Sequence, residues 1–365
     1  MDHSAPLSIA LVGPLPPPFG GMANQTLQLS RLLEGEGMRV SLIRTNAPYK
    51  PDWVGGIKGV RALFRLLPYL LEAWQRLKQV QLVHLMANSG WSWHLFSAPV
   101  IWIAHLRGVP VIVNYRGGEA ETFFTKAIQW VRPSLRRVDK IVVPSRFLAK
   151  IFADFHIEST VVPNIIDLDR FANNDKQRLN RASPHFIVCR NLEPIYDVAS
   201  GIRAFSIVAA SYPQAHLTIA GEGPERPRLE QLVKSLTIDG KVNFVGRLDL
   251  EQMAELYRSA DVMLNTSRVD NMPNALLEAM SAGVPIISTD AGGIPYMVQD
   301  GITALLSPVG DWQNIAESAT KLLADETLYQ QLSDQGIQEV ARYRWDSVKP
   351  LWMGIYAEVA GGGNR

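Results

Sequence analysis

The sequence predicts an α/β protein with two domains, each built around a doubly wound parallel sheet. Three observations support this fold class. The chain has 365 residues, which is more than one hydrophobic core usually serves. Short apolar, β-branched runs alternate with helical patterns. The alternation stops at a polar stretch, residues 173–183, and then restarts, so we expect a domain boundary there.

Six apolar runs in the first half are predicted to be buried parallel strands, because they are short and rich in Val, Ile and Leu. They are residues 8–12, 40–44, 81–86, 109–115, 140–144 and 160–162. Helical patterns separate them. The helical pattern at 22–33 contains Leu27, Leu29, Leu32 and Leu33, and the glycines at 35 and 37 end it. These elements define a first, Rossmann-like domain at 1–172.

The second half repeats the alternation, with predicted strands at 186–189, 216–220, 241–245, 261–265, 284–288 and 304–307. They define a second Rossmann-like domain at 184–343. Residues 344–365 are predicted to form a helix that crosses back to the first domain. Open α/β sheets bind ligands beyond the carboxyl ends of their strands, and pockets favour domain interfaces. We therefore expect a ligand in the cleft between the domains.

The composition disfavours several classes of protein. With one cysteine, Cys189, the chain has no internal disulfide framework, which suits a reducing compartment. Its N-terminus lacks the pattern of a signal peptide. The longest apolar stretch, 97–106, is shorter than the roughly 20 residues that a spanning helix needs. We expect a cytoplasmic protein that is not integral to a membrane.

The charge is distributed unevenly along the chain. Residues 1–180 hold 21 Lys and Arg against 13 Asp and Glu, whereas residues 181–365 hold 15 against 22. A basic first half could face an anionic acceptor or membrane, or the asymmetry could be incidental surface variation. The net charge of +1 and the lack of a basic, aromatic-interleaved motif disfavour a nucleic-acid partner.

The first predicted strand ends in a proline-rich loop that finishes in Gly20 and Gly21, directly before a helix. Glycines let the backbone approach a ligand, and a helix N-terminus presents amide groups that suit a phosphate. The spacing is not G-x-G-x-x-G, so a nicotinamide site is disfavoured. The alternative is a simple prolyl turn.

Residues 270–285 carry most of the functional signal. Pro273 suits the first turn of a helix that Asn271 or a neighbour could cap, leaving the amides of residues 274–276 for an anion. Asp270 and Glu278 would lie at different depths along one bound molecule. Alternatively, Asp270 complements the helix dipole and Glu278 is a buried structural acid.

This segment resembles that of the family-four glycosyltransferases, which have the GT-B fold. Their Glu-x7-Glu element is followed by Ala-Met-x-x-Gly-x-Pro, and here Asp270 and Glu278 precede a similar Ala-Met-Ser-Ala-Gly-Val-Pro. Further similar segments occur in the expected order, at 143–147, 162–167, 219–224, 244–247, 289–295 and 300–306. The resemblance covers nearly the whole chain.

The resemblance implies a role for each matching residue in binding a nucleotide-sugar donor. Glu278 would bind the ribose and Asp270 the donor sugar. Arg190 would neutralise the diphosphate, which the amides of the first helix and of the 270–285 helix would also hold. The implied donor-binding set is Gly20, Gly21, Arg190, Gly246, Arg247, Asn271, Asn274, Ala275, Leu276 and Glu278, with Gly246 and Arg247 lining the base. The implied catalytic set is Asp270, Arg116 and Arg190.

Four departures from the family pattern qualify these roles. Asp270 stands where Glu is usual, and Tyr196 stands where a lysine normally partners the arginine. Tyr296 replaces a family Glu. Arg116 occupies the place of a histidine, where it can stabilise phosphate charge but cannot act as a base. Less diphosphate charge would then be neutralised unless Arg116 or Arg268 contributes.

Other polar residues remain ambiguous. Glu119 or Glu121 could bind an acceptor hydroxyl or be solvated loop acids, and His84 and His94 could face the cleft or be structural. Trp91, Trp93 and Trp102 could be core or acceptor-cleft residues. The segment 58–78 reads as a basic amphipathic helix broken by Pro68, which either approaches a membrane or packs on its own sheet.

The resemblance implies a retaining transfer in which the leaving diphosphate helps take the acceptor's proton. It implies neither metal nor cofactor, and no acid cluster with magnesium spacing is evident. The expected activity is transfer from a nucleotide-sugar, such as a UDP-sugar, to a lipid-linked or growing saccharide of a surface polysaccharide or glycolipid. The alternatives are a nucleotide-sugar epimerase and a catalytically degenerate nucleotide-sugar-binding scaffold.

Overall fold

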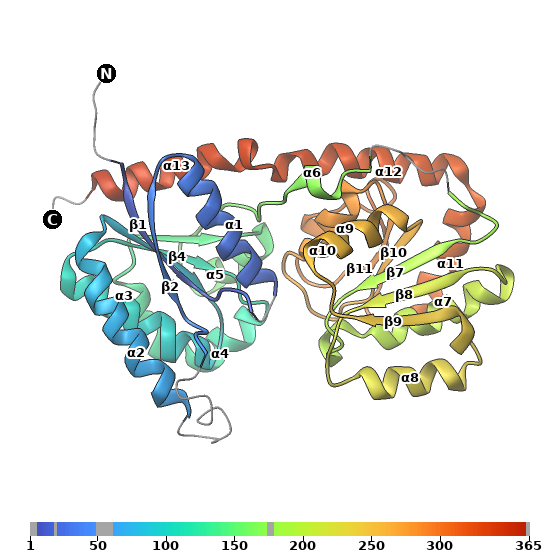
Figure 1. The fold of residues 1–365 in the computed structure, drawn as a ribbon, viewed down its shortest axis with the longest axis horizontal. Helices are drawn as coiled ribbons and strands as arrows, with labels where there is room; N and C mark the ends of the chain where they lie inside the picture. Colours follow the sequence, from blue (N-terminus) through green and yellow to red (C-terminus); the bar gives the residue numbers. More distant parts are fainter. Residues whose placement is uncertain (1–5, 18–19, 49–60, 174–178, 363–365) are drawn as a thin grey trace. The chain divides into compact units, whose positions relative to one another are not determined.

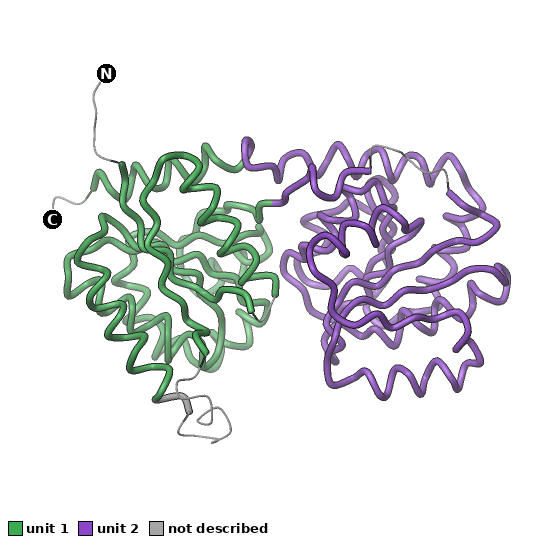
Figure 2. The backbone as a smooth tube through the Cα atoms, viewed as in Figure 1, with its two compact units in different colours: residues 1–165, 348–365 green, residues 166–347 purple. Residues whose placement is uncertain are grey.

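The computed structural model describes residues 6–17, 20–48, 61–173 and 179–362. The chain divides into two compact units, residues 1–165 with 348–365, and residues 166–347 (Figure 2). Lys58, the loop residues Pro18 and Phe19, and residues 174–178 of the predicted boundary lie outside the described residues.

Unit 1 contains a parallel six-stranded sheet with helices on both faces (Figure 1). Its strands, in the order β2-β1-β3-β4-β5-β6 across the sheet, are β1 (Ser8–Gly13), β2 (Arg39–Arg44), β3 (Leu82–Ala87), β4 (Val111–Tyr115), β5 (Lys140–Val143) and β6 (Thr160–Val161). Its helices are α1 (Gly21–Gly35), α2 (Arg61–Arg76), α3 (Ala98–Arg107), α4 (Ala120–Leu135) and α5 (Arg146–Asp154), with a π-helical turn, η3 (Trp93–Ser97), before α3. Strands β3 and β4 are buried along their whole length, as expected for a sheet covered on both faces.

Unit 2 contains a second parallel six-stranded sheet, in the order β12-β11-β10-β7-β8-β9. Its strands are β7 (His185–Cys189), β8 (His216–Ala220), β9 (Val242–Gly246), β10 (Val262–Asn265), β11 (Ile286–Thr289) and β12 (Leu305–Ser307). Its main helices are α7 (Val198–Ser211), α8 (Arg226–Ser235), α9 (Leu250–Ser259), α10 (Asn274–Ser281), α11 (Trp312–Ala324) and α12 (Glu326–Val340). The long helix α13 (Trp345–Gly361) begins in unit 2, and its residues from Val348 onward belong to unit 1.

The predicted fold class is confirmed, because each of the twelve predicted strands forms within about two residues of its expected ends. Parallel strands buried on both faces read as continuous apolar runs, so their positions are visible in the sequence. The glycine signal at the end of α1 is also confirmed, since Gly37 adopts a left-handed backbone conformation with φ of 81°.

Two local predictions are wrong. Pro68 does not break its helix, because α2 runs continuously from Arg61 to Arg76 with the proline inside it. Pro273 does not lie within the first turn of α10 but immediately before it, as the N-cap residue, which makes no side-chain cap hydrogen bond. The N-cap position is therefore held by Pro273 and not by Asn271.

None of the helices in the described parts of the chain combines the length and apolarity that crossing a bilayer requires.

Candidate active site

An arginine and an aspartate from neighbouring strands meet at the carboxyl edge of the unit 2 sheet. Arg190 directly follows β7, and Asp270 lies in the loop after β10, the strand beside β7. The two side chains form an ion pair, and only 12% and 13% of their respective surfaces are exposed. Charges this far removed from water are held in place by their mutual attraction, because separating them would leave each uncompensated.

Two further polar residues, which no sequence motif indicates, complete this cluster. Arg190 Nε donates to Asn265 Oδ1 at 2.9 Å. Ser267 Oγ lies 3.1 Å from the same Asn265 oxygen and 3.4 Å from Asp270 Oδ2. Asn265 in turn donates from Nδ2 to Ser288 Oγ at 2.9 Å. The signal available in the sequence was an Asn at the end of a predicted strand, where a buried apolar residue is usual.

The loop that carries Asp270 is fixed by its own backbone. Asp270 Oδ1 accepts a hydrogen bond from the amide of Asn271 at 2.9 Å, and its carbonyl accepts from the amide of Gly293 at 2.9 Å. A Cβ at Gly293 would overlap the carbonyl group of Asn271. Only a glycine therefore allows these two loops to approach so closely.

The N-terminus of α10 follows this loop. Ala275 and Leu276 are buried, and the Leu276 amide already donates to the carbonyl of Pro273 at 3.2 Å. The amides of residues 274–276 are predicted to hold a diphosphate. In this structure the Leu276 amide already has a backbone partner. The positive end of the helix still lies at the same edge as Arg190.

Glu278 lies one turn further along α10 and is partly buried. Burial raises its pKa, while the neighbouring Tyr257 hydroxyl and Arg190 act in the opposite direction. The Tyr257 hydroxyl is itself buried and has no hydrogen-bond partner of normal geometry among the described residues. A carboxylate beside a phenol in this setting is well suited to bind the hydroxyl groups of a ligand.

The loops after β7, β8 and β9 approach one another through their backbones. The amide of Arg190 donates to the Ala220 carbonyl at 3.1 Å, and the amide of Gly221 donates to the Gly246 carbonyl at 2.8 Å. Gly221 has φ of 152°, and a Cβ there would overlap the Arg190 carbonyl. This contact places Gly246 and the adjacent, half-exposed Arg247 at the same edge as Arg190.

The tyrosine that replaces the family lysine stacks on the arginine. The Arg190 guanidinium carbon lies 5.0 Å from the centre of the Tyr196 ring, which is within the range of a cation–π contact. Arg268, considered above as a second diphosphate ligand, instead pairs with Asp197 at 3.1 Å. Arg190 is thus the cation that the structure places against Asp270.

In unit 1, the glycine loop leads into α1 as predicted. Gly20 is the N-cap of this helix, with an extended backbone and no side-chain cap. Among the described residues, no atom lies within 4 Å of a Cβ placed on Gly20. This geometry suits an anion.

Arg116 also belongs to unit 1, where it anchors a hydrogen-bonded chain. Its Nε donates to Asn114 Oδ1 at 3.2 Å, and its Nη1 donates to Asn164 Oδ1. Asn114 Nδ2 lies 3.0 Å from His84 Nε2, and His84 Nδ1 lies 2.8 Å from the hydroxyl of Tyr356 in α13. Burial lowers the pKa of Arg116 to about 10, which leaves it charged at neutral pH.

His84 is structural rather than exposed to a ligand. It is completely buried, and burial, with Arg116 nearby, lowers its pKa to about 3. His94 is partly exposed and lies edge-on to Trp91 and Phe123. Glu119 and Glu121 are exposed at the start of α4.

The three tryptophans differ in their surroundings. Trp93 is fully buried in the unit 1 core, Trp91 is 77% exposed, and Trp102 is 39% exposed. Among the described residues, no group of three or more His, Cys, Asp or Glu could hold a metal ion.

Two family models match the chain. The model described as glycosyl transferases group 1 matches residues 169–339, and the model described as Glycosyltransferase Family 4 matches residues 19–170. The two matches follow one another directly and together run from the glycine loop to the end of α12.

Curated relatives extend this likeness. The chain is 35% identical over 176 residues to the N-acetyl-alpha-D-glucosaminyl L-malate synthase of Bacillus anthracis, a match that spans 48% of this chain and 45% of that protein. It is 24% identical over 366 residues to the phosphatidyl-myo-inositol mannosyltransferase of Mycolicibacterium smegmatis, which spans 94% of this chain and 92% of the relative.

Solved structures share the whole fold. Sucrose-phosphate synthase from Thermosynechococcus elongatus aligns with a TM-score of 0.76 at 20% identity, covering 97% of this chain and 99% of the other. Anabaena HepE in complex with UDP aligns with a TM-score of 0.76 at 15% identity, covering 96% and 100%. Taken with the twelve-stranded architecture and the two family matches, these likenesses show that the chain belongs to the group 1, family-four glycosyltransferases with the GT-B fold.

Proposed function

We propose that this glycosyltransferase moves a sugar from a UDP-sugar to a lipid-linked or growing saccharide, with retention of the anomeric configuration and without a metal ion. The observation that carries the proposal is the cluster of Arg190, Asp270 and Asn265 beside the N-terminus of α10, with Glu278 one turn deeper. This set offers one cation, two carboxylates and a helix dipole to a single elongated ligand.

The relatives support the choice of donor and acceptor. Structures of Anabaena HepE hold UDP, UDP with glucose, or UDP-glucose. The full-length relative from Mycolicibacterium smegmatis is named as a mannosyltransferase of phosphatidyl-myo-inositol, a lipid. By extension from these likenesses, the proposed donor of this chain is a UDP-sugar and the proposed acceptor is lipid-linked.

In the proposed reaction, the bond between the sugar's anomeric carbon and the donor phosphate oxygen breaks, and a bond to the acceptor oxygen forms on the same face. The acceptor's proton passes to the departing diphosphate, which leaves as UDP. Arg190 stabilises the growing negative charge, as a fixed donor does in an oxyanion site. Asp270 and Glu278 accept hydrogen bonds from the sugar and the ribose. Arg116, in unit 1, is the proposed second cation.

The surface of unit 1 supports peripheral contact with a membrane, and so a location at the inner face of the cytoplasmic membrane. We define the α2 face as Phe64, Leu67, Leu71 and Trp74, which are 43%, 59%, 62% and 44% exposed. Their spacing places them on one side of the helix, while Tyr69 and Ala73 on the other side are buried in the core. Arg107 lies over the Trp74 ring at 3.6 Å. An apolar helix face flanked by cations suits a lipid headgroup boundary.

The test begins with thermal unfolding in the presence of UDP, GDP or ADP and their sugars, all with EDTA. A ligand bound only by the native state raises the melting temperature. We expect UDP and its sugars to raise it for the wild type and for Glu317→Ala, an exposed control on α11, but not for Glu278→Ala. If no nucleotide at millimolar concentration shifts the wild type, the donor-site assignment fails.

A second measurement separates transfer from its rivals. UDP release that depends on a saccharide or lipid-linked acceptor, with an α-configured product by NMR from an α-configured donor, supports the proposal. Isomerised nucleotide-sugar formed without acceptor would indicate an epimerase instead. Nucleotide binding with no turnover on any acceptor would indicate a scaffold.

A further inference from the structure

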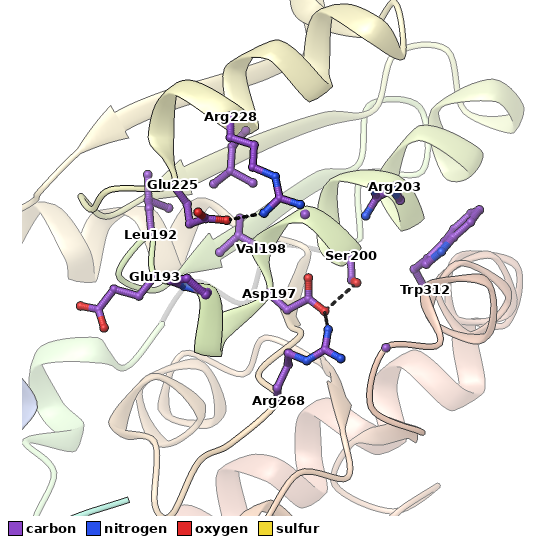
Figure 3. Close-up of a pocket in the computed structure, with 14 residues that line it drawn as sticks. Leu192, Glu193, Asp197, Val198, Ser200, Arg203, Glu225, Arg228, Arg268 and Trp312 are labelled. Carbon is purple, nitrogen blue, oxygen red and sulfur yellow. Dashed lines mark hydrogen bonds and ion pairs between the residues drawn. The ribbon is translucent and has the colours of Figure 1, made fainter. Parts of the chain in front are cut away.

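Unit 2 contains a cavity of about 500 Å³ that does not include Arg190, Asp270 or Glu278. It lies around the beginning of α7, and the start of α8, the loop after β10 and the start of α11 complete its walls (Figure 3). Its volume falls within the range of about 300–1,000 Å³ that is usual for small-molecule sites. It is larger than an inorganic ion needs.

Three guanidinium groups belong to this cavity, from Arg203, Arg228 and Arg268. Figure 3 shows Arg228 reaching from α8, and Arg268 from the loop after β10, toward the beginning of α7. Arg228 pairs with Glu225 at 2.9 Å, and Arg268 pairs with Asp197 at 3.1 Å. The guanidinium of Arg203 makes no hydrogen bond or ion pair with any residue that the structure describes.

Two of the three acidic residues in the lining, Asp197 and Glu225, pair with arginines of the cavity. Glu193 points away from the other labelled side chains (Figure 3) and its Oε1 accepts a hydrogen bond from Asn191 at 3.3 Å. Asp197 and Glu225 are therefore the two carboxylates that face three arginines. Arg203 is thus the arginine of the lining that has no carboxylate partner among the described residues, and its charge favours an anion.

The first turn of α7 adds backbone donors. Asp197 precedes the helix in a left-handed conformation with φ of 43° and does not cap it, because its carboxylate binds Arg268 and accepts from Ser200 Oγ at 3.0 Å. The amides of Val198 and Ala199 consequently have no acceptor in the described structure. An uncapped helix N-terminus beside arginines matches the oxygens of a phosphate group.

The other residues that line the cavity indicate which groups the ligand carries besides its phosphate. Leu192, Val198 and Leu229 form an apolar wall, and the carboxylates of Asp197 and Glu225 can accept hydrogen bonds from hydroxyl groups. We propose that this cavity is a second ligand site, separate from the donor site, which binds a small phosphomonoester that carries several hydroxyl groups, such as a sugar phosphate.

The short segment 195–197 contributes to the cavity through Asp197 and contacts the proposed donor site through Tyr196. The amide of Arg268 donates to the carbonyl of Ile195 at 2.8 Å, and Thr266 Oγ1 donates to the carbonyl of Asp197 at 2.8 Å. Tyr196, which contacts Arg190, lies in the same short segment. Because phosphates could also bind at Arg190, a test must separate the two sites.

The test is isothermal titration calorimetry with glucose 6-phosphate as the probe, and with glucose and inorganic phosphate as comparisons. We expect wild type to bind glucose 6-phosphate with a submillimolar Kd and at least tenfold more tightly than either comparison. Arg203→Gln, which removes no partner contact, should weaken binding at least tenfold with an unchanged circular dichroism spectrum. Glu278→Ala, which disables the proposed donor site, should bind the probe as wild type does.

Three results would overturn the proposal. One is no heat of binding for wild type at millimolar probe. Another is a Kd that Arg203→Gln leaves unchanged but that saturating UDP or Glu278→Ala weakens, because the probe would then occupy the donor site. The last is equal affinity for inorganic phosphate, which would exclude recognition of the hydroxyl groups. If Glu278→Ala still binds glucose 6-phosphate but no longer responds to UDP, then the two sites are independent. The failure of one proposal can then be told apart from the failure of the other.

Discussion

The side-chain amide of Asn114 lies 3.0 Å from Nε2 of His84, and this contact fixes which imidazole nitrogen carries the proton. Asn114 Oδ1 accepts from Arg116, so the nitrogen of the same amide faces His84 and must donate to it. Nε2 is then the acceptor, and Nδ1 carries the hydrogen that it donates to Tyr356 at 2.8 Å. A neutral histidine thus holds the amide that orients Arg116.

This relationship predicts a loss of stability in acid. The pKa of His84 falls from 6.5 to about 3 on folding, so below pH 6.5 the unfolded chain binds a proton that the folded chain rejects. Stability therefore decreases as the pH falls from about 6.5 toward 3. Between pH 7.5 and 5.5 the loss from this residue is about 1.4 kcal/mol. Urea denaturation at the two pH values measures it.

The comparison variants isolate the effect of His84. His84→Gln should be less stable than wild type at pH 7.5 but should lack this part of the acid-dependent loss. The exposed His105→Gln should retain the whole loss. Equal pH dependence in wild type and His84→Gln would show that His84 is not held neutral.

The ion pair of Arg190 and Asp270 predicts a large effect on stability as well as on donor binding. Arg190→Met keeps similar bulk but leaves a poorly solvated carboxylate without its cation, and we expect it to cost about 2 kcal/mol or more. Arg226→Met is the control, because its pair with Glu230 is 39% and 45% exposed and should contribute less than about 1 kcal/mol. Urea denaturation of both variants at neutral pH provides the measurement, and similar losses would argue against the buried pair.

Gly293 is predicted to be essential for the position of the Asp270 loop. Gly293→Ala places a methyl group against the Asn271 carbonyl and should destabilise the protein by about 1–3 kcal/mol, as overpacking does. Gly240→Ala is matched, since its Cβ would meet no atom of the described residues within 4 Å. We also expect Gly293→Ala to weaken UDP binding. Thermal unfolding with and without UDP checks both effects, and an unperturbed Gly293→Ala protein would contradict the close approach of the two loops.

Cys189 is predicted to be chemically inert in the native protein. It is buried, and burial raises the pKa of its thiol to about 12, so very little reactive thiolate exists at pH 8. Labelling with Ellman's reagent should be slow in native buffer and rapid in denaturant. A native rate close to that of free cysteine would show that the loop after β7 opens readily.

The α2 face predicts binding to anionic vesicles. Wild type should float with vesicles that contain an anionic phospholipid and less with neutral ones, because both apolar insertion and cations contribute. The double variant Leu67→Glu with Leu71→Glu should lose this binding. Ile207→Glu changes a residue of unit 2 that is 42% exposed and should bind as wild type does. Equal flotation of all three proteins would exclude the α2 face.

The site was only partly visible in the sequence. Motif spacing identified Arg190, Asp270 and Glu278 as candidates, but the pairing of Arg190 with Asp270 joins residues 80 positions apart. Asn265 and Ser267 carry no motif, and their roles follow from the adjacency of β7 and β10. The environment of His84 likewise depends on Tyr356, which comes from a helix 272 positions later in the chain.

Local patterns in the sequence determined the two-sheet α/β fold and the position of every predicted strand, because burial on both faces of a parallel sheet leaves an unbroken apolar run. Tertiary structure alone decided which polar side chains meet. Pro68 shows the difference at small scale, since packing of α2 on the unit 1 core overrides a local helix breaker. The arginines around the start of α7 show the same difference between local pattern and tertiary structure. Arg203, Arg228 and Arg268 belong to no motif in the sequence, and only the order of the strands brings them to one cavity.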